Sequence, residues 1–199
     1  MCDNVGYIKF KKNSEGDFKM DGMGYSLSNW QFNHQVHEIE WEADENMWGA
    51  VIAMIKKIKA AGKPIFFDPT TTGALKVVSL EEALSWVAMM DGILLNSEEA
   101  LYLGNSKDLV EAEKNLQKYT PLVVIKLGSK GAMAVDGSES AKVPAVTTNV
   151  VDTTGAGDSF AAGFIPKWLE TSDLTQALTA GAALAAKCVS SVGARPPLN

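Results

Sequence analysis

Residues 152–160 read Asp-Thr-Thr-Gly-Ala-Gly-Asp-Ser-Phe, and this stretch decides how the rest of the chain is interpreted. It joins an extended run, Val143 to Val151, to a helix rich in small residues that we expect from about Gly155 to Leu169. The start of a helix presents unpaired backbone N–H groups and the positive end of the helix dipole. A loop with two glycines, Gly155 and Gly157, at that point predicts a place where an anion can sit.

Asp158 lies beside this predicted anion hole, where a second negative charge would be repelled. A carboxylate makes chemical sense there if it takes a proton from a hydroxyl group that attacks phosphorus. The alternative is an ordinary capped helix with an aspartate in its first turn. Glycine at both positions 155 and 157 gives capping no extra benefit, so the pattern favours a phosphate site.

Further motifs occur along the chain in an order that carries a family resemblance. They are Phe67-Asp68-Pro69, Leu95-Asn96-Ser97-Glu98-Glu99, the run from Val124 to Ala132, Ala161-Ala162-Gly163-Phe164 after the glycine loop, and the tail from Ala185 to Ala194. Together with residues 152–160 they resemble the ribokinase-like (PfkB) carbohydrate and nucleoside kinases. The resemblance runs from about Ala43 to the end of the sequence.

The resemblance implies a doubly wound α/β fold with a mostly parallel sheet between helices. It implies that ATP, with Mg²⁺, gives its γ-phosphate to a hydroxymethyl group of a small-molecule sugar or nucleoside acceptor. Asp158 would accept the hydroxyl proton, while the N–H groups of Gly155, Ala156 and Gly157 hold the charge on the transferring phosphoryl group.

Asn96 and Glu99 match the family's Asn-x-x-Glu pattern. This match implies a network around Mg²⁺ and the phosphates, with Glu99 acting on the metal through water. Mg²⁺ prefers oxygen ligands and keeps several waters, so one carboxylate with one amide is a reasonable set. An equally good interpretation from sequence is that Asn96 turns the chain and that Glu99 is a first-turn helix acid.

Gly128 and Gly131 form a Gly-x-x-Gly turn after a predicted strand. By resemblance this turn lies against the nucleotide, with Lys126 nearby, and Thr154 belongs to the same nucleotide site. Without the family context, a hairpin turn that needs positive φ is the simpler interpretation of the two glycines.

Asp152, Thr154 and Gly193 match positions that in some family members support a monovalent cation, such as K⁺, close to the anion hole. The glycine would contribute its carbonyl oxygen. An aspartate at the beginning of a loop is otherwise a common turn-forming residue, which is the alternative for Asp152.

Hydrophobic periodicity predicts alternating helices and strands with an antiparallel edge. We expect strands at 64–67, 92–95 and 122–127 and a strand pair from 131 towards 146, with helices from 47, 79 and 97, over 107–118 and 155–169, and from 174 to 191. Asp68, Asn96, Gly128 and Asp152 each follow a predicted strand end. Ligands bind beyond the carboxyl ends of strands in open α/β sheets, so we expect these four residues to share one rim.

Residues 1–42 differ from residues 43–199, which we expect to form the α/β nucleotide-binding domain. Val5 to Lys12 alternates as a strand, and Phe18 to Leu27 could pair back with it. The segment is irregular and the sequence does not assign it a role; covering a sheet edge and meeting a second subunit in a homodimer are two options that stay open. The family's N-terminal half, with its sugar-reading residues, is not recognisable, and Thr70-Thr71-Thr72 stands where many relatives have asparagine and arginine.

The composition is that of an ordinary globular domain. The chain has 199 residues, 46% of them hydrophobic, and a formal net charge of −6. Its lysine clusters are short and flanked by acids, so nucleic-acid binding has little support. Neither a secretory signal nor a membrane-spanning run is apparent, which predicts a cytoplasmic protein. Two function classes stay open: a small-molecule kinase, and a truncated, non-catalytic nucleotide-binding relative with a structural or regulatory role.

Overall fold

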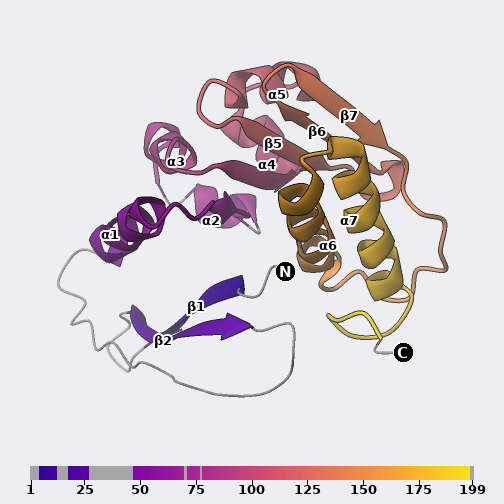
Figure 1. Cartoon of the computed structure of the whole chain (residues 1–199), viewed down its shortest axis with the longest axis horizontal. Coiled ribbons are helices and arrows are strands. Elements are labelled where there is room, and N and C mark those ends of the chain that lie inside the picture. Colours follow the sequence, from indigo (N-terminus) through magenta and orange to yellow (C-terminus); the bar gives the residue numbers. More distant parts are fainter. Residues whose placement is uncertain (1–4, 13–17, 27–46, 70, 77, 198–199) are drawn as a thin grey trace. The chain divides into compact units, whose positions relative to one another are not determined.

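The computed structural model describes residues 5–12, 18–26, 47–69, 71–76 and 78–197 of the chain (Figure 1). The chain divides into two compact units, Met1–Ala61 and Gly62–Asn199. The predicted domain boundary between residues 42 and 43 lies outside the described residues. Within the described part of the chain, no helix combines the length and the apolar character needed to cross a bilayer.

The first unit contains a strand pair and a helix. Strand β1 (Val5–Lys12) pairs antiparallel with β2 (Phe18–Ser26), and the register shifts between Lys9 and Phe10. Helix α1 spans Met47–Ala60, with Lys57 and Lys59 in its last turn, where cations favour the helix dipole. The first strand was predicted from the alternation of polar and apolar residues, its pairing with residues 18–27 was raised as an option, and the helix was predicted from apolar residues at helical spacing; the structure contains all three.

The second unit is built on a mixed five-stranded sheet in the order β3-β4-β5-β6-β7. The strands are β3 (Phe66–Phe67), β4 (Gly92–Asn96), β5 (Leu122–Lys126), β6 (Ala132–Asp136) and β7 (Glu139–Val143). β3, β4 and β5 are parallel, whereas β6 and β7 extend the sheet antiparallel to them. The parallel series with an antiparallel edge is therefore confirmed, although β3 is shorter than the expected run from 64 to 67.

Helices connect and cover the strands of this sheet. They are α2 (Thr72–Leu75), α3 (Leu80–Val87), α4 (Ser97–Leu103), α5 (Leu109–Leu116), α6 (Ala156–Thr171) and α7 (Leu174–Val189), with a 3₁₀ turn, η1, at Gly128–Lys130. Ser79, Asn96, Asp108 and Asp173 each cap a helix by accepting a hydrogen bond from the backbone N–H three residues later. These side chains satisfy N–H groups that a helix start leaves free, which fixes where each helix begins.

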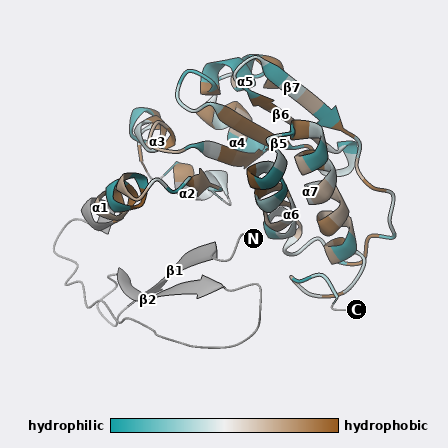
Figure 2. Cartoon of the chain, in the orientation of Figure 1, coloured by the Kyte–Doolittle hydropathy of each residue, from teal (hydrophilic) through white to brown (hydrophobic). Residues whose placement is uncertain are grey.

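The central strands are buried on both faces, as expected for parallel strands between helices. Leu94, Val124 and Ala134 belong to a buried cluster with Phe164 of α6 and Leu178 of α7. The alternate residues of β4 and β5 point to the opposite face, where α4 contacts both strands and packs against α5. Figure 1 shows α6 and α7 on one side of the sheet and α4 and α5 on the other, and Figure 2 shows hydrophobic residues along β5 and β6.

The segment after β7 differs from the prediction. An extended run from Val143 to Val151 was expected, but residues 144–150 form neither helix nor strand. Val150 and Val151 keep 59% and 50% of their surface exposed. Because these valines are not packed against the sheet, their β propensity finds no partner strand, and the chain leaves the sheet at Val143.

Helices α6 and α7 cross closely because small residues meet at their contact. A Cβ atom added to Gly163 would lie 2.6 Å from the carbonyl oxygen of Ala180, and one added to Gly181 would lie 3.0 Å from Phe160. Phe160 stacks on Phe164 with 6.0 Å between ring centroids. The close crossing brings the first turn of α6 and the last turns of α7 to the same end of the sheet.

We expect Gly163→Ala to lower the free energy of unfolding by about 1–2 kcal/mol, because overpacking outweighs the gain in helix propensity. Urea denaturation measures this change. Ala162→Ser, at the exposed neighbouring position of the same helix, is the control and should change stability by less than about 0.5 kcal/mol. A higher midpoint for Gly163→Ala would contradict close helix packing at this residue.

Candidate functional site

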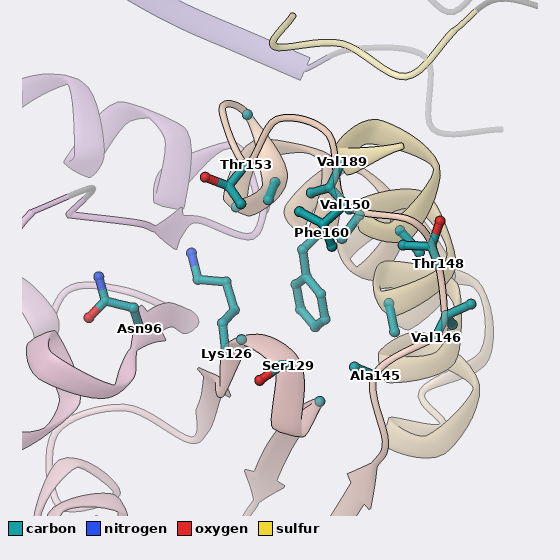
Figure 3. Close-up of a pocket in the computed structure, with 18 of the residues that line it drawn as sticks. Asn96, Lys126, Ser129, Ala145, Val146, Thr148, Val150, Thr153, Phe160 and Val189 are labelled. Atoms are coloured by element: carbon teal, nitrogen blue, oxygen red, sulfur yellow. The ribbon is translucent and has the colours of Figure 1, made fainter. Parts of the chain in front are cut away.

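A cavity of about 890 Å³ opens at the carboxyl ends of the parallel strands in the second unit. Its polar side chains include Asp68 after β3, Asn96 at the end of β4, Lys126 at the end of β5 and Asp158 in the first turn of α6. Figure 3 shows Asn96, Lys126 and Ser129 on one side of this pocket and Thr153, Phe160 and Val189 on another. Several strand ends and one helix start thus contribute to one site, as the topology predicts.

Three of the four residues expected at the rim line the cavity, and the fourth does not. Asp68, Asn96 and Gly128 are lining residues, whereas Asp152 is not. The prediction for Asp152 assumed a strand before it, but residues 144–150 are irregular. The backbone N–H of Val151 instead donates to the carbonyl oxygen of Val189, at 2.8 Å, which ties this segment to the end of α7.

Asn96 and Glu99 form a reciprocal capping box at the start of α4. The backbone N–H of Glu99 donates to Asn96 Oδ1 at 2.9 Å, and the backbone N–H of Asn96 donates to Glu99 Oε2 at 2.7 Å. These bonds fix both side chains at the strand end. The interpretation of Asn96 as a turn residue and Glu99 as a first-turn helix acid agrees with this geometry, which leaves Glu99 Oε1 for another partner.

One oxygen of Glu99 is left over. The residue is fully buried, it lines the cavity, and Oε1 has no hydrogen-bond partner among the described residues. Burial raises the pKa of this carboxyl above its usual range, against the backbone N–H bond from Asn96, which lowers it. A buried acceptor without a partner costs free energy, so Oε1 suits a donor that enters the cavity, such as a metal-bound water.

Lys126 reaches across the sheet to Asp68, and their ammonium and carboxylate groups form a partly buried ion pair. The ammonium also lies beside the glycine loop, because a Cβ atom added to Gly157 would be 3.4 Å from Lys126 Nζ. Lys126 was expected near the nucleotide only because of the family resemblance, and Asp68 was expected only to lie at the rim formed by the strand ends. No local pattern predicts this pair, since its members are 58 positions apart.

The glycine loop begins α6 with free donors. Gly155 has φ +76°, and a Cβ atom there would lie 2.2 Å from the carbonyl oxygen of Ala194. The N–H groups of Gly157 and Asp158 meet no hydrogen-bond acceptor among the described residues. Ala156 was expected to share the anion hole, but its N–H donates to the carbonyl oxygen of Thr153 at 3.2 Å. The donors therefore come from the first turn of α6, directly beside the exposed Asp158.

Asp152 connects the glycine loop to the tail after α7. Its Oδ1 accepts the N–H of Thr154 at 2.9 Å, and its Oδ2 accepts the N–H of Gly193 at 3.0 Å. These two bonds hold the pKa of Asp152 below its usual range. The turn interpretation is supported by this geometry, whereas a monovalent cation at Asp152, Thr154 and Gly193 stays a prediction.

Gly128 and Gly131 have φ +60° and +96°, and both line the cavity. A Cβ atom on Gly131 would lie 1.9 Å from the carbonyl oxygen of Val143, so glycine is needed there both for backbone conformation and for space. The turn interpretation therefore accounts for Gly131, and a nucleotide contact of this turn stays a prediction.

The other half of the cavity is apolar, and sequence reasoning did not assign it to the site. It is lined by Ala145, Val146 and Val150 from the irregular segment and by Ala182, Ala185, Ala186 and Val189 from α7. Residues 177–186 were interpreted only as a tightly packed helix. The spacing of residues 182, 185, 186 and 189 places them on one helix face, a signal that could have indicated a flat apolar wall.

Gly155→Ala and Gly157→Val should separate the structural glycine from the one that leaves room for a ligand. Gly155→Ala should lower the free energy of unfolding by about 1–3 kcal/mol, because alanine disfavours the left-handed backbone there and its Cβ atom would collide with Ala194. Gly157 has no positive φ, and a Cβ atom there would meet the flexible end of Lys126 at 3.4 Å, so Gly157→Val should melt near the parent temperature but lose anion binding. Thermal melts and calorimetric titration with Mg·ATP measure both effects. Retained affinity in folded Gly157→Val would make that loop purely structural.

A family model for pfkB family carbohydrate kinases matches residues 9–199, further towards the N-terminus than the motifs alone indicated. An uncharacterized sugar kinase of Archaeoglobus fulgidus is 38% identical over 105 residues, covering 53% of this chain and 42% of that protein. A fructokinase of Vibrio alginolyticus is 31% identical over 127 residues, covering 62% of this chain and 41% of that protein.

Solved structures agree with the sequence relatives. The adenosine kinase of Sinorhizobium meliloti matches with a TM-score of 0.70 and 28% identity, covering 75% of this chain and 46% of that one. A putative ribokinase II of E. coli in complex with ATP and Mg²⁺ matches with a TM-score of 0.67 and 26% identity, covering 73% and 48%. The chain spans less than half of the length of each of these four relatives. With the ribokinase-like fold and the match over residues 9–199, the chain belongs to the pfkB family of carbohydrate kinases.

Proposed function

We propose that the cavity binds ATP with Mg²⁺ and that the protein is a phosphotransferase acting on a hydroxymethyl group of a sugar or nucleoside. The observation that carries this proposal is the meeting of three features in one cavity. They are the free N–H groups of Gly157 and Asp158, the exposed Asp158 carboxylate and an apolar wall on α7. Family membership supports the same reaction class.

The two halves of the cavity fit the two halves of a nucleotide. The wall of alanines and valines offers a flat apolar surface for a purine ring, and the first turn of α6 offers donors for phosphates. The volume of about 890 Å³ falls within the roughly 300–1,000 Å³ of small-molecule sites. A nucleotide laid between these ends would bring its terminal phosphate to Asp158 and Lys126.

Asp158 is the group we assign to proton transfer. Its side chain is exposed at the cavity, so a hydroxyl group can approach it from solvent. As the hydroxyl oxygen attacks phosphorus, the carboxylate accepts its proton, while the neighbouring N–H groups stabilise the charge on the phosphoryl oxygens. Both functions come from one helical turn, which keeps them in fixed geometry.

The residues present fit Mg²⁺ held through water. Among the described residues, no group of three or more His, Cys, Asp or Glu side chains could hold a metal. Glu99 Oε1 is the buried acceptor that a metal-bound water would satisfy. When bound with the nucleotide, Mg²⁺ would neutralise part of the phosphate charge. A K⁺ ion near Asp152, Thr154 and Gly193 is a further part of this proposal.

A non-catalytic nucleotide-binding protein is the second candidate. It is motivated by the match covering 42% of the Archaeoglobus fulgidus protein and 46% of the adenosine kinase, with acceptor binding unassigned among the described residues. In such a protein, ATP or ADP would bind in the cavity and stabilise the fold without transfer to an acceptor. Binding without turnover separates this candidate from the kinase.

Glu99→Gln should be more stable than the parent at neutral pH. Because the folded pKa of Glu99 is raised, the fold favours the neutral carboxyl. The resulting contribution to the free energy of unfolding of the parent is fully present below the ordinary glutamate pKa of about 4.3. It is lost as pH rises through the raised value. The stability difference between variant and parent should therefore be near zero at about pH 4 and should grow in favour of the variant towards pH 7.

The control for this variant is Glu113→Gln on α5. Glu113 is also buried, its Oε1 also has no partner among the described residues, and burial also raises its pKa, but it does not line the cavity. Melting curves from pH 4 to 8 should show the same trend for both variants. In titrations with ATP at varied Mg²⁺, only Glu99→Gln should lose the Mg²⁺-dependent part of the affinity. Equal losses would rule out the metal role of Glu99.

Asp158→Asn should keep the affinity for Mg·ATP within a few-fold of the parent and lower acceptor-dependent turnover by about 10² or more. The assay measures ADP release with a panel of hexoses, ribose and nucleosides, with Glu139→Gln on the exposed edge strand as the control. For the chain alone we expect turnover below the ordinary range of about 1–10³ s⁻¹. Equal turnover of Asp158→Asn and parent would remove Asp158 from the mechanism, and absence of nucleotide binding would overturn both candidate functions.

A further inference from the structure

The apolar end of the cavity contains few polar side chains. The irregular segment contributes the hydroxyl groups of Thr147 and Thr148, and the part of α7 that lines the cavity contributes only alanines and a valine. Figure 3 shows Val146 and Thr148 on the side of the pocket opposite Asn96. A base placed against α7 therefore meets two hydroxyl groups and free backbone, but no amide, carboxylate or cationic side chain from these two segments.

The polar groups that this end does offer can bind either donors or acceptors. A threonine hydroxyl both donates and accepts hydrogen bonds, and it rotates to suit its partner. The backbone N–H and C=O groups of residues 145–150 form no backbone hydrogen bond within the described part of the chain. The amino group of adenine needs an acceptor and the carbonyl group of guanine needs a donor, and the segment can supply both. Its donors and acceptors therefore form no pattern that fits only one purine.

This end of the cavity is also open to water. Val146 and Val150 keep 46% and 59% of their surface exposed, and Thr147 is exposed as well. A site rejects the wrong base strongly only when that base leaves a polar group buried without a partner. Water satisfies such a group at an open end, either directly or as a bridge to the protein. The penalty for exchanging one purine for another is therefore small.

The wall on α7 distinguishes rings by their area. Residues 182, 185, 186 and 189 lie on one helix face, and the three alanines leave a flat surface from which no long side chain protrudes. Apolar burial stabilises a complex in proportion to the area buried, so a two-ring purine gains more than a one-ring pyrimidine. Adenine and guanine have the same ring system, so the wall does not separate them.

We infer that the cavity accepts purine nucleotides without distinguishing adenine from guanine, so that ATP and GTP are alternative phosphoryl donors. This inference rests on the proposed function and names the class of donor that the site takes. Ring area selects purines over pyrimidines, while the exposed hydroxyl and backbone groups leave the substituents of the purine ring unread.

The experiment is calorimetric titration of the 199-residue chain with Mg·ADP, Mg·GDP, Mg·CDP and Mg·pyrophosphate, alongside thermal melts. Mg·GDP should bind within about tenfold of Mg·ADP, because both bases cover the same wall. Mg·CDP should bind several-fold more weakly than either purine nucleotide, because its ring covers less of the wall. Mg·pyrophosphate, which has no base, should bind more weakly than all three nucleotides.

Variants of α7 and of the irregular segment test where the base lies. Ala186→Leu raises a branched side chain on the wall and should weaken Mg·ADP and Mg·GDP at least tenfold and by the same factor, with Mg·pyrophosphate affinity within twofold of the parent. Ala182→Leu, on the same face, is the second variant if the first unfolds. Thr148→Val should change both purine affinities by less than about threefold, because water replaces the exposed hydroxyl. Ala183→Leu, at an exposed position of α7 outside the cavity lining, is the matched control and should leave all four affinities unchanged.

The outcomes separate this inference from the proposed function. A Mg·GDP affinity more than tenfold below that of Mg·ADP, or Mg·CDP binding as tight as Mg·ADP binding, would overturn the inference while the nucleotide site would stand. Unchanged purine affinities in folded wall variants would also overturn it, because the base would then lie elsewhere. Mg·pyrophosphate binding as tight as Mg·ADP binding would have the same meaning. A parent chain that binds none of the four probes would overturn both the inference and the proposed function.

Discussion

The left-handed backbone at Gly155 is the constraint on which the site depends. It sets the point at which α6 begins, and its contact with Ala194 leaves no space for a side chain. Helix α6 then starts with its free N–H groups beside the ends of β3, β4 and β5. If this helix began one residue earlier or later, its turn of 100° per residue would direct these donors away from Lys126.

The packing of α6 on α7 transmits this constraint to the rest of the second unit. Gly163 and Gly181 allow the two helices to approach, and their shared core with β4, β5 and β6 fixes both against one face of the sheet. The same contact places the alanine face of α7 along the cavity. The glycine-loop end and the apolar wall of the cavity are therefore held by one core, which suits a ligand that spans both.

Local sequence patterns predicted most of the elements but only part of the site. The helix starts near 79 and 97 and the strands of the parallel series could be predicted because each depends on neighbours within a few positions. The prediction of a strand between Val143 and Asp152 was wrong, because valines form a strand only where a partner strand exists. The pair of Lys126 with Asp68 could not be predicted, since it depends on the order of strands in the sheet. Ala156 was assigned to the anion hole because sequence does not show which N–H groups a loop uses internally.

The irregular segment at 144–150 has a consequence for the evolution of the site. Its N–H and C=O groups make no backbone hydrogen bond within the described part of the chain, and its side chains line the apolar end of the cavity. Substitutions or insertions there would disturb no sheet ladder, whereas changes at the glycine loop would meet Ala194 and Lys126. Under the proposed function, substitutions at 144–150 would therefore change the fit of the nucleobase and leave the glycine loop intact, so donor preference and phosphate binding would vary separately.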